Sequence, residues 1–221
     1  MVSMKISDII EEYLEAVYRL QERDGVARTS DLVAMLNVAP GTVTNTVERL
    51  EKNLLVIHVP YRGVKLTEEG RKIALNVIRK HRLLECLLMD FLEIGWDKVH
   101  RIACNLEHWI NGEVTRKIEC VLGYPKTCPH GNPIPNESGE IVDEETYPLS
   151  KFNVGEKGII TRIIEENEEF LQYLTKIGAM PKRSITVIDK APSGDPITIK
   201  VNDKTQALSC KTASLIMIRK C

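Results

Sequence analysis

The stretch from residue 100 to residue 108 most constrains this chain, because it places metal-binding side chains at helical spacing. Four such side chains occupy positions i, i+4, i+7 and i+8: His100, Cys104, Glu107 and His108. These positions share one face of an α-helix, where a core-facing helix would carry Leu or Ile. We interpret the stretch as a helix that supplies metal ligands. The alternative is a half-buried helix with scattered polar residues, since short motifs also match by chance.

Bulk composition limits the class of protein. The chain has 221 residues, of which 43% are hydrophobic and 28% are charged, which is ordinary for a globular protein with two or three small domains. It contains no run of 18 apolar residues, and its first residues lack the apolar core of a secretion signal. We therefore expect a cytoplasmic protein without a membrane partner.

Cysteine spacing and net charge add two further limits. The six cysteines contain no Cys-x-x-Cys pair, which in a cytoplasmic chain argues against a disulfide framework and a structural zinc knuckle. One or two thiols could be metal ligands, and the others are expected to be buried. The net charge of −1 gives no general attraction to nucleic acid, so any DNA-binding charge must be local.

The first segment has the pattern of a helix-turn-helix. Apolar residues at helical spacing predict a helix from Ser7, and a second helix is expected to be capped at residues 29–31. A break at residues 37–41 separates it from a third helix beginning at Thr42, whose buried side would carry Val43, Val47 and Leu50. Two short helices joined by a tight turn, with small polar side chains opening the second, are typical of this DNA-binding motif.

A predicted hairpin at residues 54–66, followed by a helix capped by Thr67, extends the motif to a winged helix. Several side chains are expected to face outward and to contact DNA: Thr42, Thr44, Asn45, Thr46, Arg49 and Arg62. Hydroxyl and guanidinium groups can bind phosphates, and an asparagine amide can bind adenine. The alternative is a winged helix used only for protein contacts.

A second set of ligand types lies on a predicted helix at residues 78–92. Its apolar stripe is wider than a small domain can bury, which predicts a homodimer interface: Leu84, Leu87, Leu88, Phe91 and Leu92. The same helix carries His81 and Glu85 at positions i and i+4. Together with His100 these could form one metal site, and the rest of the stretch 100–108 could form another.

These residues resemble the iron-dependent repressor family typified by the diphtheria toxin repressor, which also has manganese-responsive members. The matching residues are Lys80 to Leu83, Val99-His100, Glu107-His108 and the run Pro129-His130-Gly131-Asn132-Pro133-Ile134-Pro135. The resemblance extends through the winged helix and, more weakly, through the C-terminal part. It implies a repressor whose DNA binding depends on a metal ion.

The resemblance implies two metal sites. The regulatory site would use Cys104, Glu107, His108 and a first-helix residue, which is Glu12 here, where iron-responsive members carry Met. Glu15 matches a carboxylate of the manganese-responsive branch, whereas Cys104 matches the iron-responsive branch. The metal is therefore expected to be Fe(II), with Mn(II) as the alternative, and Co, Ni or Zn could substitute.

The second implied site is ancillary. It would use His81, Glu85 and His100 with two ligands from the C-terminal domain, which fall on Glu166 and Glu169. The alternative for these two glutamates is a solvated acidic run at residues 165–169. Two further residues, Arg82 and Asn132, match family positions linked to a bound anion, and the alternative for Arg82 is a surface cation.

Beyond a polar boundary near residues 136–148, apolar residues alternate with period two, which predicts strands at 158–163, 184–188, 197–201 and 215–218 with a helix at 168–174. This pattern suggests a small SH3-like barrel, and it resembles the C-terminal domain of the repressor family and of a small iron-transport accessory protein.

The sequence thus predicts an α+β protein of three parts. These are a winged helix-turn-helix DNA-binding domain (1–75), an all-α metal-binding dimerisation domain (76–142) and a small SH3-like β-barrel (148–221). The expected function is a homodimeric, metal-dependent transcriptional repressor that binds palindromic double-stranded operators of metal-homeostasis genes, and not an enzyme. Two alternatives remain: a metalloenzyme with a helical di-metal site, and a DNA-binding regulator that does not depend on metal.

Overall fold

The computed structural model describes residues 7–142, 144–192 and 194–220. The opening residues considered above for a secretion signal lie largely outside this part, as does Cys221. The chain forms two compact units: the first contains the N-terminal region to Lys80 and Pro135–Glu140, and the second contains His81–Ile134 and the region from Ile141. The expected boundary at residue 75 falls within a continuous helix, α4 (Glu68–Asp90). No helix among the described residues is long and apolar enough to cross a membrane.

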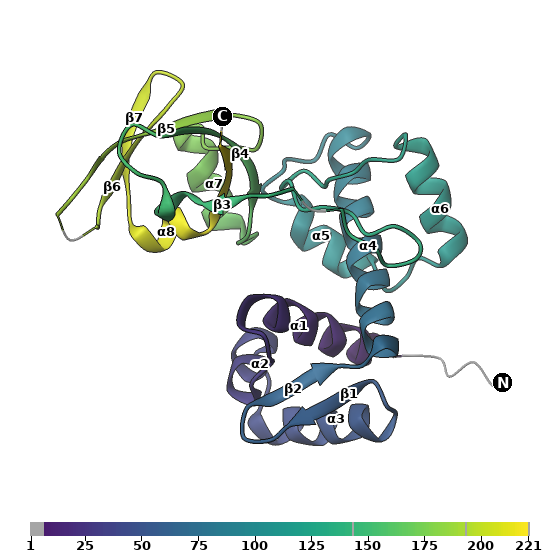
Figure 1. The fold of residues 1–221 in the computed structure, drawn as a ribbon. Coiled ribbons are helices and arrows are strands. Elements are labelled where there is room, and N and C mark those ends of the chain that lie inside the picture. The colour runs from purple at the N-terminus through teal and green to yellow at the C-terminus, as the bar shows by residue number, and fades with distance from the viewer. Residues whose placement is uncertain (1–6, 143, 193, 221) are drawn as a thin grey trace. The chain divides into compact units, whose positions relative to one another are not determined.

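The first unit is the expected winged helix-turn-helix (Figure 1). Its elements are α1 (Asp8–Asp24), α2 (Thr29–Leu36), α3 (Pro40–Lys52), β1 (Val56–Val59) and β2 (Gly63–Leu66). The apolar face of α1 is buried as expected, and Gly25 ends this helix in the left-handed conformation with φ 77°. The N-cap position of α2 is Arg28, so the predicted cap at residues 29–31 is one residue too late.

The third helix differs from the prediction at its start. It begins at Pro40, two residues before the expected Thr42, because proline has a helical φ and the first helical position needs no N–H donor. Thr46 is only 8% exposed, so its predicted outward orientation is wrong. It follows Val43 by three residues and therefore shares the buried face of the helix.

The wing is an antiparallel pair of strands, β1 and β2. Gly63 has φ +132°, and a Cβ at this position would lie 2.1 Å from the carbonyl oxygen of Ala27. Only glycine therefore allows the strand to pass this backbone. After the wing, the Thr67 hydroxyl accepts a hydrogen bond from the Gly70 N–H at 3.1 Å, which confirms Thr67 as the cap of the next helix.

The helical part of the second unit consists of the second half of α4, α5 (Val99–Leu106) and α6 (Gly112–Val121). Its apolar core contains Leu83, Leu84, Leu88, Val99, Ala103 and Ile118. Helix α5 ends at Leu106, so only the first half of the predicted metal-binding stripe is helical. Glu107 is the C-cap residue, and His108 follows in a turn.

The rest of the second unit is a six-stranded antiparallel sheet in the order β3-β8-β4-β5-β6-β7. The strands are β3 (Tyr147–Pro148), β4 (Lys157–Ile163), β5 (Ser184–Lys190), β6 (Ile197–Val201), β7 (Lys204–Leu208) and β8 (Ile216–Lys220), with the 3-10 turn η1 (Leu149–Lys151) and helices α7 (Glu168–Ile177) and α8 (Cys210–Ser214). Strand β7 was not predicted, because its residues are mostly exposed and polar. The SH3-like fold expected for this region is confirmed.

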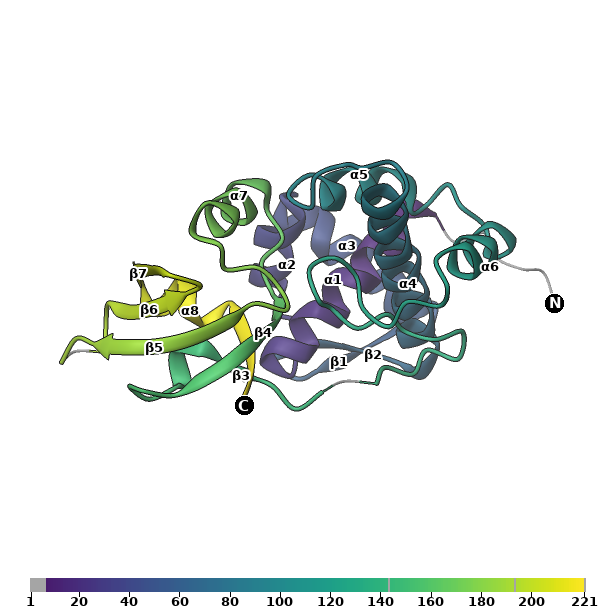
Figure 2. The ribbon, with the colours of Figure 1, turned by 90° about the horizontal axis from the view of Figure 1, so that it is seen from above.

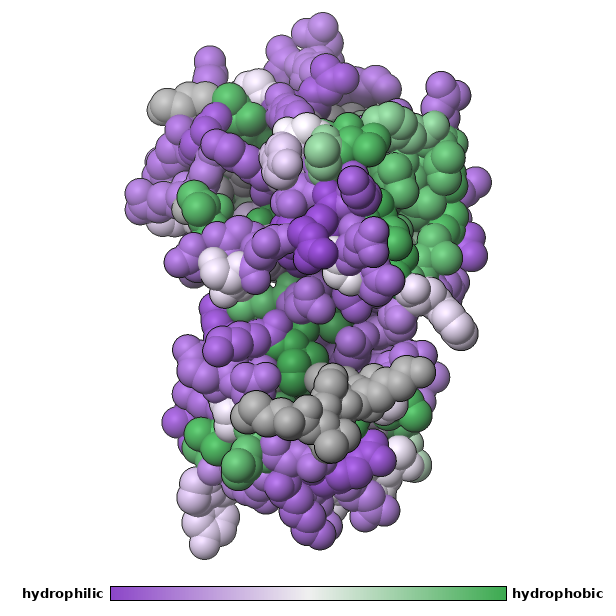
Figure 3. Space-filling view, turned by 90° about the vertical axis from the view of Figure 1, so that its right-hand side faces the viewer, coloured by the Kyte–Doolittle hydropathy of each residue, from purple (hydrophilic) through white to green (hydrophobic). Residues whose placement is uncertain are grey.

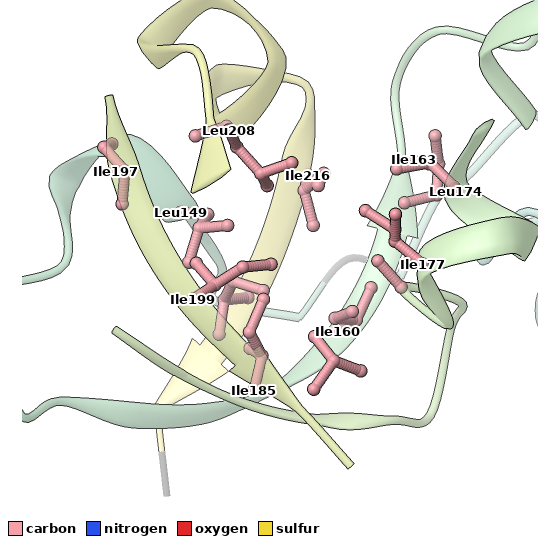
Figure 4. Close-up of a cluster of buried hydrophobic side chains, with 14 of the residues drawn as sticks. Leu149, Ile160, Ile163, Leu174, Ile177, Ile185, Ile197, Ile199, Leu208 and Ile216 are labelled. Carbon is pink, nitrogen blue, oxygen red and sulfur yellow. The ribbon is translucent and has the colours of Figure 1, made fainter. Parts of the chain in front are cut away.

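One apolar core joins α7 to this sheet. Leu171, Leu174 and Ile177 of the helix pack with strand residues such as Ile160 and Ile185. Figure 4 shows Leu174 and Ile177 facing the strand residues Ile160 and Ile185. Figure 2 shows α7 beside α5, at the edge of the sheet region. The residues that lead from β4 into α7 therefore have a fixed position in the second unit.

Candidate metal centre

Four segments of the second unit bring potential metal ligands together. Helix α4 carries His81 and Glu85 one turn apart, and α5 carries His100 and Cys104 one turn apart. A loop after α6 adds Cys128 and His130, and the segment between β4 and α7 adds Glu166. The ligand atoms fall into three overlapping groups, and within each group they lie within 4.8 Å of one another.

The first two groups contain His81 and His100. Nε2 of His81 lies 3.0 Å from Oε1 of Glu85 and 3.0 Å from Nδ1 of His100. Nδ1 of His100 also lies 3.1 Å from Oε2 of Glu166. The structure therefore brings together the predicted ligands His81, Glu85, His100 and Glu166, and Cys104 forms the other group with the two histidines.

The third group contains two residues that the sequence analysis did not identify as ligands. It consists of Glu85, Cys128, His130 and Glu166, all of which are buried. Nδ1 of His130 lies 3.1 Å from Oε1 of Glu85, and Nε2 donates to the Trp96 carbonyl oxygen at 2.7 Å. The sequence feature that could have identified this group is the Cys-x-His spacing at residues 128–130. It overlaps a run that was quoted above only for its family resemblance.

The two halves of the stretch 100–108 meet at His81. Nδ1 of His81 donates to Oε2 of Glu107 at 2.6 Å, and Oε1 of Glu107 lies 3.4 Å from Nε2 of His108. The thiol of Cys104 lies 3.9 Å from Nδ1 of His81 and 3.7 Å from Nε2 of His100. His81 thus contacts residues assigned to both predicted sites.

Burial and charge have opposite effects on the histidines. Burial lowers the pKa of His81, but the negative charge of Glu85 and hydrogen bonds with neighbouring side chains raise it well above its ordinary value. Burial likewise lowers the pKa of His100, and hydrogen bonds with Cys104 and Glu166 raise it to about 11. A metal ion must displace protons from these rings, so metal binding should weaken at low pH.

The pKa values of the carboxylate and thiol ligands are also shifted. Burial raises the pKa of Glu85, but the charge of His81 and hydrogen bonds from neighbouring histidines hold it well below its ordinary value. Burial raises the pKa of the Cys104 thiol, and hydrogen bonds with His100 and His81 lower it overall. Burial, together with the charge of Glu85, raises the pKa of Cys128 well above 9.0.

Two unpartnered atoms test whether these residues suit a metal ion. Oε2 of Glu85 and Nδ1 of His130 are buried and make no hydrogen bond of good geometry in the described part of the chain, although Nδ1 lies 3.1 Å from Oε1 of Glu85. Buried polar atoms without partners are costly, and both atoms are ordinary metal ligands. His130 uses its other ring nitrogen to bind a backbone carbonyl, an arrangement typical of metal-ligating histidine. The donor set therefore fits a divalent ion.

Five predicted ligands lie outside the three groups: Glu107 and His108, whose contacts are given above, and Glu169, Glu12 and Glu15. Glu169 is exposed and belongs to none of the three groups, which cover the described residues. Glu12 lies on α1 with an exposed side chain. Glu15, on the same helix, accepts a hydrogen bond from Nε of Arg19 at 2.9 Å. The roles of all five residues as ligands remain predictions.

The two residues predicted to bind an anion, Arg82 and Asn132, donate hydrogen bonds to oxygen atoms of the protein. Arg82 donates to the Pro133 carbonyl. The Asn132 amide donates to Oε1 of Glu166 at 2.7 Å and to the Ile163 carbonyl at 3.2 Å. Asn132 therefore orients a carboxylate of the ligand groups, and the anion role of this pair remains a prediction.

The predicted DNA-contacting residues are on α3 and the wing of the first unit. With the exception of Thr46, they have exposed side chains: Thr42, Thr44, Asn45, Arg49 and Arg62. The Thr44 hydroxyl donates to the Pro40 carbonyl at 3.1 Å, so in this state it is used within its own helix. The other four are available for contacts with a partner.

Known sequence families match three successive parts of the chain. The family described as iron dependent repressor, N-terminal DNA binding domain, matches residues 5–64. The family described as iron dependent repressor, metal binding and dimerisation domain, matches residues 67–136, and the FeoA domain matches residues 147–220.

Individual proteins match over most of their length. The diphtheria toxin repressor of Corynebacterium glutamicum is 36% identical over 83% of this chain and 85% of that protein. The iron-dependent repressor IdeR of Mycobacterium leprae is 29% identical over 96% of this chain and 97% of its own.

Solved structures of metal-dependent repressors are also similar to this chain. A manganese-dependent transcriptional repressor in complex with manganese has a TM-score of 0.88 at 28% identity, covering 96% of this chain and all of that one. The IdeR structure from T. acidophilum has a TM-score of 0.83 at 25% identity, covering 99% of this chain and all of that one. The chain belongs to the iron-dependent repressor family.

Proposed function

We propose that this protein is a metal-dependent transcriptional repressor that binds double-stranded operator DNA as a homodimer when Fe(II) is bound, with Mn(II) as the alternative ion. The observation that carries this proposal is the presence, in one chain, of a winged helix with an exposed polar recognition face and a buried cluster of histidine, glutamate and cysteine side chains. The family is one of transcriptional repressors, which are not an enzyme class, and a repressor would act in the cytoplasm.

The types of ligand atom support a divalent ion of intermediate softness. Carboxylate and imidazole groups suit Fe(II) and Mn(II), while the thiols of Cys104 and Cys128 favour Fe(II) or later ions such as Co, Ni and Zn. Manganese and iron are both named in relatives of this chain. We therefore keep Fe(II) as the first candidate. The regulatory site would include Cys104, Glu107 and His108, with Glu12 as the further ligand implied by the family resemblance.

The apolar surface on α4 and α6 supports the homodimer. Figure 3 shows a broad apolar area on the face that carries α6. A shallow hollow there is lined by Leu87, Glu113, Val114, Lys117, Ile118 and Val121. Val114 and Val121 are 42% and 59% exposed, and Phe91, the residue after α4, is 54% exposed. Apolar surface of this kind on one domain marks an interaction site.

A metal ion can promote DNA binding only if it binds more tightly to the DNA-binding arrangement of the dimer than to other arrangements. Two winged helices that enter successive major grooves must be spaced by one DNA turn, about 34 Å. A coupling free energy of about 3 kcal/mol between metal and DNA would change operator affinity more than hundredfold. Repression of metal-uptake genes would then respond to the concentration of the ion.

The test uses DNA duplexes selected by this protein from a random library. Binding is measured by fluorescence anisotropy under anaerobic conditions with Fe(II), with Mn(II) and with a chelator. We expect at least one of the two ions to lower the Kd for the selected duplex by more than about a hundredfold. Equal binding with metal and with chelator would rule out metal dependence, and an absence of any selected sequence would rule out the repressor function.

A further inference from the structure

The turn of the wing carries a fully exposed tyrosine. Tyr61 is 109% exposed, which is the highest fraction among the large hydrophobic side chains of the described residues. Its hydroxyl has no hydrogen-bond partner within residues 7–142, 144–192 and 194–220. Because Tyr61 buries no apolar surface, the hydrophobic effect gives it no part in stabilising the fold.

The backbone conformation of Tyr61 is also unfavourable for a bulky residue. The Arg62 N–H donates to the Val59 carbonyl at 2.9 Å and closes a four-residue turn with Pro60 and Tyr61 at its centre. Tyr61 has φ 58°, which lies in the left-handed region that glycine or asparagine adopts at lower cost. Folding stability alone would favour one of those two residues here, so the fold does not explain the tyrosine.

The wing that holds this turn is fixed to the rest of the first unit. Val64 of β2 exchanges two backbone hydrogen bonds with Ala27, at 3.0 and 2.9 Å. On the other strand, Nδ1 of His58 lies 2.8 Å from Oε1 of Glu51 on α3. The wing is therefore attached to the helix whose exposed face is predicted to contact DNA, and its turn extends that face.

The charge of the wing suits an anionic partner. Arg62 follows Tyr61 directly, Lys65 lies on β2, and both side chains are exposed. Residues 56–66 contain no Asp or Glu, and neither cation forms an ion pair with any described residue. Such a surface complements the phosphate backbone of duplex DNA. A tyrosine adds a hydroxyl that can donate to a phosphate oxygen and a ring that can pack on a sugar.

We propose that Tyr61 is a DNA-contacting residue whose ring packs on a deoxyribose of the operator and whose hydroxyl donates to a phosphate, beside the major groove that α3 enters. Arg62 neutralises a neighbouring phosphate. The unfavourable backbone conformation is retained because it directs the ring toward the DNA. This inference rests on the proposed function and adds a contact to it, and a homodimer would make that contact twice on each operator.

The experiment measures DNA binding by fluorescence anisotropy with the full-length protein. Two duplexes are used, the selected one and one of scrambled sequence, each at saturating Fe(II) and at saturating Mn(II). The variants are Tyr61→Gly, which removes the side chain, and Tyr61→Phe, which removes only the hydroxyl. Lys182→Gly is the matched control, because Lys182 is exposed and has φ 70° but belongs to the sheet domain.

A backbone contact carries no sequence information, so Tyr61→Gly should weaken binding to both duplexes by the same factor. We expect its Kd to rise at least about tenfold, since a hydrogen bond to a charged group is lost. Tyr61→Phe should lose less, and the control should bind as wild type. An unchanged Kd in Tyr61→Gly, or a loss confined to the selected duplex, would overturn the proposal.

Urea denaturation separates this role from a structural one. Glycine adopts a positive φ without steric cost, so the unfolding midpoint of Tyr61→Gly should equal or exceed that of wild type, as should that of Lys182→Gly. A lower midpoint in Tyr61→Gly together with weaker DNA binding would show that the tyrosine supports the fold, which would contradict the proposal.

The two proposals fail in different ways. A wild-type protein that selects no duplex would disprove both the repressor function and the contact made by Tyr61. A wild-type protein that binds its duplex equally well with and without metal would disprove only the metal dependence, because the Tyr61 variants are compared with wild type under identical conditions. Normal operator binding by Tyr61→Gly would disprove this inference alone.

Discussion

His81 and Glu107 are joined by a hydrogen bond of 2.6 Å from Nδ1 to Oε2, and Nε2 of the same ring lies 3.0 Å from Glu85. One buried imidazole therefore connects α4 to the turn that ends α5. It contacts a residue assigned to the regulatory site on one side and a residue of the ancillary site on the other. Occupancy of either site should affect the other through this ring.

The first prediction concerns removal of this connection. We expect His81→Gln to weaken Mn(II) binding about 10–100-fold, because the change removes a ligand and its hydrogen bond to Glu107. Isothermal titration calorimetry measures the affinity. His58→Gln, which alters an exposed histidine on β1 that pairs with Glu51 at 2.8 Å, is the control and should bind as wild type. Wild-type affinity in His81→Gln would contradict the assignment.

The second prediction concerns pH and the metal-free protein. The folded pKa of His100 is raised from 6.5 to about 11, so its contribution to stability is full below pH 6.5 and is lost as the pH rises toward 11. The pKa of Glu85 is lowered, so its contribution is lost as the pH falls below 4.5. The unfolding free energy should therefore decline as the pH rises from about 6.5 toward about 11.

Urea denaturation in the presence of a chelator measures this slope. His100→Gln should show a shallower decline than wild type, because the titrating imidazole is absent. A decline of equal steepness in the variant would show that His100 does not carry the effect.

The third prediction distinguishes the roles of two neighbouring residues of α3 in DNA binding. Asn45 is exposed and Thr46 is 8% exposed. Asn45→Ala should weaken binding to the selected duplex by about 1–3 kcal/mol with little change in stability, because an amide contact to a base is lost. Thr46→Val keeps the shape of a buried side chain, so operator affinity should stay within about twofold. The reverse ranking in an anisotropy titration would disprove the assigned orientations.

The fourth prediction concerns the apolar face of α6. Val121 is 59% exposed, so Val121→Glu should leave the monomer folded while placing a charge in the proposed subunit interface. Analytical ultracentrifugation should then show monomers at concentrations where wild type is dimeric. Val154→Glu changes a valine of similar exposure, 56%, on the sheet domain and should remain dimeric. Dimeric Val121→Glu would exclude this face as the interface.

Periodicity predicted the elements well wherever one face of an element is buried. The helices of the winged domain and strands such as β6 show this. Periodicity failed to predict the end of a helix where the pattern of residue types continues beyond that end. Helix α5 ends at Leu106, although the ligand types continue at helical spacing to His108. Helix ends depend on the hydrogen bonds made by the next segment, which periodicity does not report.

The candidate metal centre was predicted in part. His81 and Glu85 form a local pair one turn apart, and the family resemblance added Glu166. Cys128 and His130 lie in an irregular loop, where no helical or strand period marks the side chains that face inward. Their position depends on the packing of this loop against β4, where a Cβ on Gly131 would lie 1.9 Å from the Thr161 carbonyl oxygen. Such long-range contacts are not visible in local sequence patterns.

The fifth prediction tests the role of Asn132, which donates to Glu166 at 2.7 Å and to the Ile163 carbonyl at 3.2 Å. Asn132→Ala removes no ligand but removes a hydrogen bond that orients the Glu166 carboxylate, so metal affinity should fall about 10–100-fold. If Asn132 instead acts by binding an anion, the variant and wild type should differ only when sulfate or phosphate is present. Titrations with Mn(II) in chloride and in sulfate buffers distinguish the two roles, and an equal loss of affinity in both would establish Asn132 as the residue that orients Glu166.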